Sequence, residues 1–144
     1  MKKQLLALAF LLPLMFWINC SSATGANLEV TPTQDLIVGE WLGTWRMSAY
    51  AGSATVSISQ GPGNNQPAAF FTLYETGTGG GTKQFQVHGS IEGERLVFRS
   101  PGSITRLALY QSSDGKSILK GDYELLSGRF SGEKGQYEFE KKGK

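Results

Sequence analysis

Few side chains in this 144-residue chain have the chemistry of a catalyst. His88 is the single histidine, and it alternates with Phe85 and Val87, so we expect it on an outer face. A serine nucleophile needs a base within reach, and no spacing here places His88 or a lysine beside a serine. A metal site needs several convergent ligands, and His88 has no second His or Cys in the expected domain. We therefore expect no enzyme, no catalytic residue, no metal and no cofactor.

Paired carboxylates are the next candidates, since two acids on one face can serve as the acid and base of a glycosidase. Glu92 and Glu94 flank a glycine in an expected hairpin turn. Glu138 and Glu140 alternate with aromatic residues, which indicates the solvated face of a strand. Both pairs are interpreted as surface carboxylates.

The sequence contains no pattern typical of a phosphate-binding or nucleic-acid-binding protein. The glycine-rich run 77–82 lacks the lysine of a P-loop and precedes no helix, so it is expected to be a strand connection. The net charge is +2, with 14 Lys and Arg against 12 Asp and Glu, and Lys2 and Lys3 account for the whole surplus. A nucleic-acid partner is not expected, because it requires a basic surplus on the domain itself.

The chain begins with a segment that has the pattern of a secretory signal. Lys2 and Lys3 precede an apolar run over residues 5–18 that only Pro13 interrupts. This run is short for a membrane-spanning helix, which needs about 20 residues; an uncleaved anchor helix is the alternative. We expect residues 1–20 to be a signal peptide or lipoprotein signal of an exported, bacterial-type protein. Such a protein is periplasmic, anchored to the outer membrane or secreted, and meets the membrane only through its signal or lipid.

Cys20 is the only cysteine and directly follows the apolar run. That is the place of the lipid-modified cysteine in a bacterial lipoprotein, so Cys20 is the candidate lipidation site. Trp17 and Asn19 depart from the usual lipobox, and cleavage after Ala23 or Ala26 would instead remove Cys20. Both outcomes stay open, and in either case the mature domain has no internal disulfide.

A polar stretch over residues 21–36 follows and is interpreted as a tether, and residues 37–144 form the expected domain. From Glu40 onward, apolar and polar residues alternate in short runs separated by turn residues. Asp114-Gly115 is the clearest hairpin signal. About eight consecutive strands predict an all-β fold, namely a single antiparallel up-and-down barrel, because closure removes exposed sheet edges. A β-sandwich is the alternative.

Aromatic residues concentrate on the faces that are expected to point inward. Six of them are candidates for a ligand-binding barrel interior: Trp41, Trp45, Phe71, Phe85, Phe98 and Tyr123. They either fill the core or line a pocket for an apolar ligand, and core filling is favoured because such bulky residues leave little volume in a short barrel.

The first expected strand contains Gly39-Glu40-Trp41 and, overlapping it, Gly43-Thr44-Trp45. Two Gly-x-Trp units at the start of an all-β meander resemble the calycin-type barrels: lipocalins, fatty-acid-binding proteins, avidins and small bacterial lipocalin-like domains. The resemblance implies that Trp41 or Trp45 lies across a closed barrel end. It also implies that a basic residue of the last strand, Lys141 or Lys142, packs over that ring.

The function expected from this resemblance is binding of a small apolar ligand inside the barrel. The alternative is an envelope module that binds a protein, such as an accessory subunit or a protease inhibitor whose trunk, residues 21–33, enters the enzyme.

Overall fold

A computed structural model describes residues 27–77 and 80–143 of the chain. The predicted signal segment and Cys20 lie outside these residues. Nine strands and one single-turn helix follow one another: β1 Leu28–Val30, α1 Gln34–Ile37, β2 Gly39–Met47, β3 Tyr50–Ser59, β4 Ala68–Glu75, β5 Thr82–Glu92, β6 Arg95–Ser100, β7 Ser103–Gln111, β8 Ser117–Leu125 and β9 Lys134–Lys141. Within the described residues, no helix is long and apolar enough to cross a membrane.

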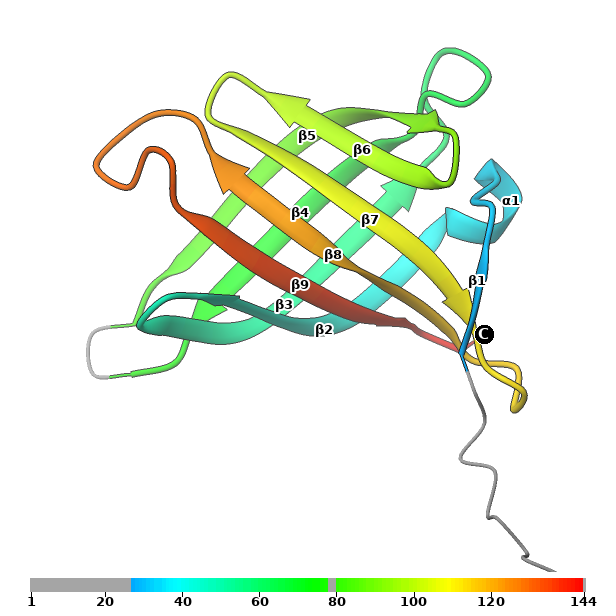
Figure 1. The fold of residues 1–144 in the computed structure, drawn as a ribbon, viewed down its shortest axis with the longest axis horizontal. Helices are drawn as coiled ribbons and strands as arrows, with labels where there is room; N and C mark the ends of the chain where they lie inside the picture. The colour runs from blue at the N-terminus through cyan, green and yellow to red at the C-terminus, as the bar shows by residue number, and fades with distance from the viewer. Residues whose placement is uncertain (1–26, 78–79, 144) are drawn as a thin grey trace, which may run out of the picture.

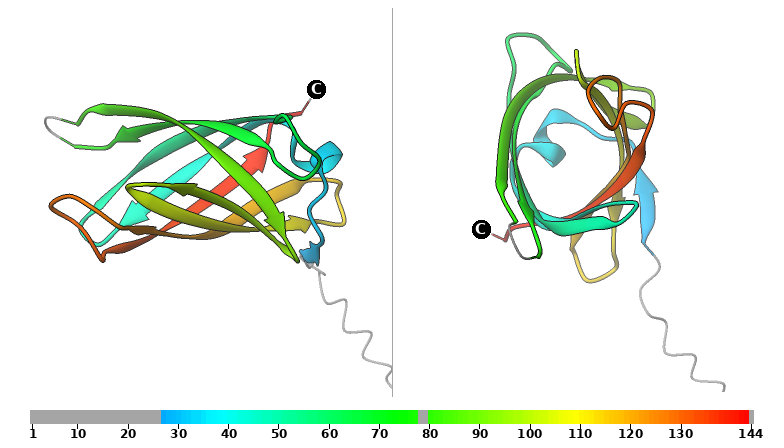
Figure 2. Two further views of the ribbon diagram at one scale, coloured as in Figure 1. Left: turned by 90° about the horizontal axis from the view of Figure 1, so that it is seen from above. Right: turned by 90° about the vertical axis from the view of Figure 1, so that its left-hand side faces the viewer.

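Strands β2 to β9 form one closed antiparallel barrel (Figure 1). Each strand pairs with the next along the chain, and β2 also pairs with β9, from Trp41 opposite Lys141 to Met47 opposite Gly135. Seen along its axis, the sheet is a complete ring (Figure 2, right). The predicted barrel is therefore confirmed, and the sandwich alternative is excluded.

Alternation of side chains produces this architecture. In β9, exposed and buried residues alternate strictly from Lys134 to Glu140, with Tyr137 and Phe139 inside. Two hairpin turns lie where the sequence predicts them. Gly93 and Gly115 connect paired strands there and adopt positive φ angles of 61° and 84°.

Two short elements precede the barrel: β1 lies within the predicted tether, residues 21–36, and α1 begins within it and ends at Ile37. β1 pairs with β7, Val30 opposite Leu109, along the part of β7 that extends beyond its pairing with β6. An ion pair between Glu29 and Arg95 joins β1 to the start of β6. One helical turn and three strand residues are too short to leave a periodic pattern in the sequence.

Candidate functional site: the mouth of the barrel

One end of the barrel, called the closed end here, is sealed by α1 (Figure 2). Trp41 lies beneath it with no exposed surface, and its indole Nε1 donates a hydrogen bond of 2.8 Å to the carbonyl oxygen of Ile37. The Lys141 ammonium lies 5.4 Å from the Trp41 ring centroid and donates a hydrogen bond of 2.6 Å to the carbonyl oxygen of Leu36. The indole ring of Trp41 and the ammonium group of Lys141 therefore both attach α1 to the barrel.

The middle of the barrel is filled by packed rings around Phe71. Its ring centroid lies 5.1 Å from that of Phe85, 5.6 Å from Tyr137, 5.7 Å from Phe98 and 6.1 Å from Phe139. Stacked and edge-to-face pairs at these distances are favourable. A ligand therefore meets a floor of rings rather than a channel that reaches the closed end.

The opposite end, the mouth, is lined by apolar side chains that are only partly buried. Four inward residues that are only partly buried lie toward the strand ends at the mouth, and we call them the mouth layer: Trp45, Leu73, Phe85 and Leu125. Phe85 also stacks on Phe71 and so joins this layer to the rings below. Beside them Phe130, in the β8–β9 connection, packs on the core and contacts the Tyr50 ring at 5.9 Å. Partly exposed apolar side chains that point into a barrel can bind apolar ligands.

Phe85 is accessible because the sheet is incomplete beside it. The register pairs β6 with β5 only from His88 to Glu92, so the first half of β5 pairs with β4 alone. Phe85 belongs to that half, and the Lys83 ammonium lies 5.9 Å from its ring centroid. The mouth thus has one apolar wall with a cation at its rim.

Trp45 is held in place by a glycine on the neighbouring strand. Its Nε1 donates a hydrogen bond of 3.1 Å to the carbonyl oxygen of Tyr74, across Gly52. A Cβ atom at Gly52 would lie 1.6 Å from that oxygen and 2.7 Å from the indole Nε1. Only glycine therefore permits this position of the ring.

Two tyrosines, Tyr123 and Tyr137 of the floor, pack against each other. The Tyr123 and Tyr137 ring centroids are 4.6 Å apart, and Tyr123 lies over Gly135, where a Cβ atom would be 2.2 Å from the ring. Burial, and to a lesser extent the charge of Glu133, raises the pKa of Tyr123 to about 12. Burial also raises the pKa of Tyr137 well above its ordinary value. Both phenols therefore stay neutral at physiological pH.

The predicted ligand-lining residues divide into two groups. Trp41, Phe71 and Phe98 are fully buried, and Tyr123 is nearly so, which makes them core and floor. Trp45 and Phe85 are partly buried and belong to the mouth. Sequence reasoning missed Leu73, Leu125 and Phe130, although the alternation of β4 and β8 did place the first two on inward faces.

The polar candidates from the sequence lie on the outer surface. His88 is exposed and pairs across the sheet with Arg99. Glu138 and Glu140 form surface ion pairs with Lys120 and Lys116. Residues 27–77 and 80–143 contain no group of three or more His, Cys, Asp or Glu that could hold a metal ion.

Glu92 forms an ion pair with Arg99 across the β5–β6 hairpin. Hydrogen bonds from the Arg99 guanidinium and then from the Ser90 hydroxyl lower the pKa of Glu92 to about 2. Glu92 is therefore ionised at any ordinary pH and cannot act as a general acid.

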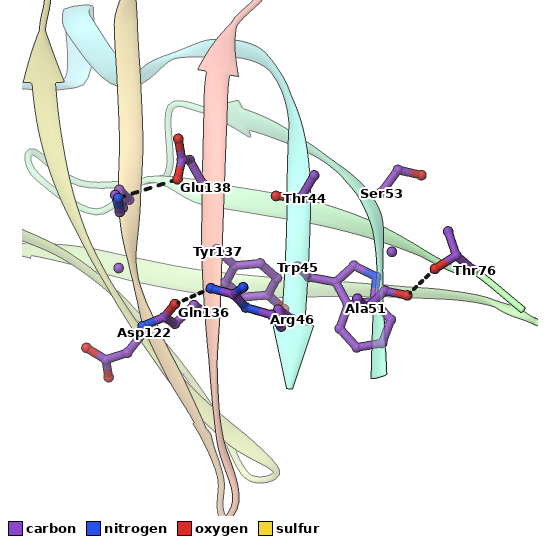
Figure 3. A pocket seen from close by; sticks show the side chains of 13 residues that line it. Thr44, Trp45, Arg46, Ala51, Ser53, Thr76, Asp122, Gln136, Tyr137 and Glu138 are labelled. Carbon is purple, nitrogen blue, oxygen red and sulfur yellow. Dashed lines mark hydrogen bonds and ion pairs between the residues drawn. The ribbon is translucent and has the colours of Figure 1, made fainter. Parts of the chain in front are cut away.

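A hollow of about 700 Å³ opens on the outer surface of β8, β9, β2 and β3 (Figure 3). Small hydroxyl side chains, Thr44, Ser53 and Thr76, line one part of it, and longer polar side chains line the other. Among these, the Arg46 guanidinium donates a 3.2 Å hydrogen bond to the side-chain oxygen of Gln136. The hollow opens outside the barrel, but Trp45 of the mouth layer and Tyr137 also belong to its lining, so it adjoins the mouth.

No family model matches the chain, and no curated protein matches it significantly. The class of protein is therefore defined by fold and site alone. It is an eight-stranded antiparallel β-barrel with one sealed end and an apolar mouth above a floor of aromatic rings.

Proposed function

We propose that the domain is an exported, lipocalin-like binding module that holds a small apolar ligand across the mouth of its barrel. The observation that carries this proposal is the mouth layer, in which Trp45, Leu73 and Phe85 point inward yet stay partly exposed. Burying such apolar surface against a ligand is favourable, because it removes that surface from water.

The geometry of the closed end supports the lipocalin-like part of the proposal. A Gly-x-Trp tryptophan across a sealed end, with a last-strand lysine over its ring, is the arrangement that the resemblance predicts for Trp41 and Lys141. Because the Phe71 layer fills the barrel below the mouth, the ligand lies across the opening and does not penetrate deeply.

Lys83 favours a ligand that carries an acid group at one end. Its ammonium stands at the rim beside Phe85, where an apolar chain on the ring would bring a carboxylate within reach. A medium-chain fatty acid has this combination of an apolar chain and an anionic head.

The test is a titration of the protein with a fluorescent fatty-acid analogue, followed by displacement with unlabelled fatty acid. Saturable binding is expected, and Phe85→Ala and Trp45→Ala should each weaken it about tenfold, because each removes apolar contact area. Leu28→Ala is the matched control, since Leu28 is 69% exposed on β1, outside the barrel. Absence of saturable binding, or equal affinities for all variants, would disprove the proposal.

A second variant separates the apolar contact from the charge. Lys83→Met should weaken binding of the fatty acid but leave binding of the corresponding fatty alcohol unchanged, because the alcohol lacks the carboxylate. Equal effects on acid and alcohol would assign Lys83 no role in recognising the head group.

A further inference from the structure

The outward side chains of β6 to β9, the charged half of the barrel, form ion pairs, whereas two adjacent strands of the other half, β3 and β4, carry no outward charge. Every outward position of β3 and β4 is uncharged, and we call these positions the neutral face: Ala51, Ser53, Thr55, Ser57, Ser59, Ala68, Phe70, Thr72 and Tyr74. The outward positions of β6 to β9 instead carry ion pairs, including Arg106 with Asp122 and Lys120 with Glu138. Charged side chains normally cover the surface of a small domain, so their absence from two adjacent strands requires a reason.

Two aromatic rings stand exposed on the neutral face. Phe70 is 44% exposed and Tyr74 is 43% exposed, and both project outward from β4, whereas Thr72 between them is buried. Leu42, 49% exposed on β2, pairs with Thr55 on β3, which in turn pairs with Thr72. Exposed apolar groups therefore lie beside exposed hydroxyl groups, such as those of Ser53 and Ser59, on the outer surface of the sheet.

The outer hollow adjoins this face. Thr44 and Ser53 line the hollow, and Ser53 pairs directly with Tyr74. Beyond them the hollow offers the Arg46 and Gln136 side chains, which are joined by a hydrogen bond (Figure 3). The charged groups that line it balance, since Arg46 and Lys120 oppose Asp122 and Glu138. The hollow and the neutral face form one continuous surface without a net charge.

We propose that this surface, Phe70 and Tyr74 on β4 together with the adjoining hollow, binds a neutral glycan chain. A sugar ring presents apolar C–H groups on its faces and hydroxyl groups around its edge. The C–H faces pack on the negative faces of the Phe70 and Tyr74 rings. The sugar hydroxyls exchange hydrogen bonds with Ser53, Thr44 and the Gln136 amide, which both donate and accept.

The composition of the surface distinguishes a glycan from the other occupants. An anionic polymer would need a surplus of Lys or Arg, and the neutral face has neither. The core of a protein interface is typically rich in Tyr, Trp, Phe, Met and Arg and poor in Ser and Ala; Phe70 and Tyr74 fit this composition, but serine and alanine supply five of these nine outward positions. A neutral partner that is itself rich in hydroxyl groups fits this chemistry best.

The experiment measures binding of the protein, expressed from the full chain, to soluble cellohexaose, chitohexaose and maltohexaose and to insoluble cellulose and chitin. Polygalacturonate serves as the anionic comparison. We expect binding to at least one neutral glycan, little dependence on salt, and no binding to polygalacturonate.

Two variants locate the site. Phe70→Ala and Tyr74→Ala should each weaken glycan binding about tenfold, because each removes a stacking surface. Tyr110→Ala is the matched control, since Tyr110 projects outward from β7 in the charged half. Thermal unfolding of each variant checks that the barrel is intact.

Loss of glycan binding in the β4 variants alone would support the proposal. Three results would overturn it: no binding to any neutral glycan, equal binding by the β4 variants, or equal loss in Tyr110→Ala. Concentration-dependent dimerisation that Tyr74→Ala abolishes, without glycan binding, would also overturn it and assign the face to a second copy of the chain. None of these results depends on whether the mouth binds an apolar ligand.

Discussion

The two ends of the barrel use the same short sequence unit with different results. Gly39-Glu40-Trp41 and Gly43-Thr44-Trp45 lie on one strand, and both tryptophans point inward. Trp41 is covered by α1 and Lys141 and has no exposed surface, whereas Trp45 meets neither and stays partly exposed. The covering elements, rather than the Gly-x-Trp unit, decide which ring becomes core and which remains available to a ligand.

The largest expected effect comes from exchanging each ring for alanine. Trp41→Ala should lower the free energy of unfolding by about 3–5 kcal/mol, because it opens a cavity at the closed end. Trp45→Ala should cost about 1–2 kcal/mol, because part of that ring is already in water. Urea unfolding followed by far-UV circular dichroism measures both, and equal losses would contradict the division between the ends.

The lysine over Trp41 should contribute less than the ring itself. Lys141→Met removes the contact with the Trp41 ring and the hydrogen bond to Leu36, which together should cost about 1–2 kcal/mol. The matched control is Lys142→Met, since Lys142 is exposed and its neighbour already fills the place over the ring. Identical midpoints for both variants in urea would show that the charge does not help to seal the barrel.

Alkaline pH should act through the tyrosines below the mouth. Their pKa values are raised in the folded state, to about 12 for Tyr123, so the folded protein retains protons that the unfolded chain loses near pH 10. Stability is therefore full below pH 10 and falls as the pH rises toward 12. The unfolding midpoint, measured from pH 8 to 12, should decline less in Tyr137→Phe than in the wild type. An unchanged decline in that variant would assign the effect to other groups.

The smallest effect is expected from the ion pair on the β5–β6 hairpin. Both partners are exposed, so Arg99→Gln should change the unfolding midpoint too little to resolve at neutral pH. Because the pKa of Glu92 is lowered in the folded protein, any stabilisation by this ion pair is complete at a pH above the ordinary carboxyl pKa. It is lost as the pH falls toward 2. If Arg99→Gln lowered the unfolding midpoint at neutral pH as much as Lys141→Met does, surface charge rather than the buried Trp41 ring would be the main source of stability at the closed end.

Several features of the fold were predictable because they depend on local pattern. Period-two alternation placed Tyr137 and Phe139 inside, and turn chemistry located the hairpins at Gly93 and Gly115. The site was only partly predictable. Trp41 and Trp45 have the same parity on β2, and no local signal separates a ring that will be covered from one that will not.

Other features depend on segments that meet only in the folded molecule. The neutral face follows from outward residues of β3 and β4, yet its continuity with the hollow depends on the register that sets Ser53 beside Tyr74. The exposure of Phe85 depends on β6 being too short to pair with the first half of β5. Such relations link residues far apart in the chain, where sequence periodicity carries no information.

The sequence by itself determined which side chains face inward, where the chain turns, and that eight strands follow one another, since these properties arise between near neighbours. The sequence favoured a closed sheet over a sandwich and a filled core over a pocket, but only the tertiary structure decided between these alternatives and showed that α1 seals one end. The physical reason is that closure and packing depend on strand tilt, register and the volumes of distant side chains acting together.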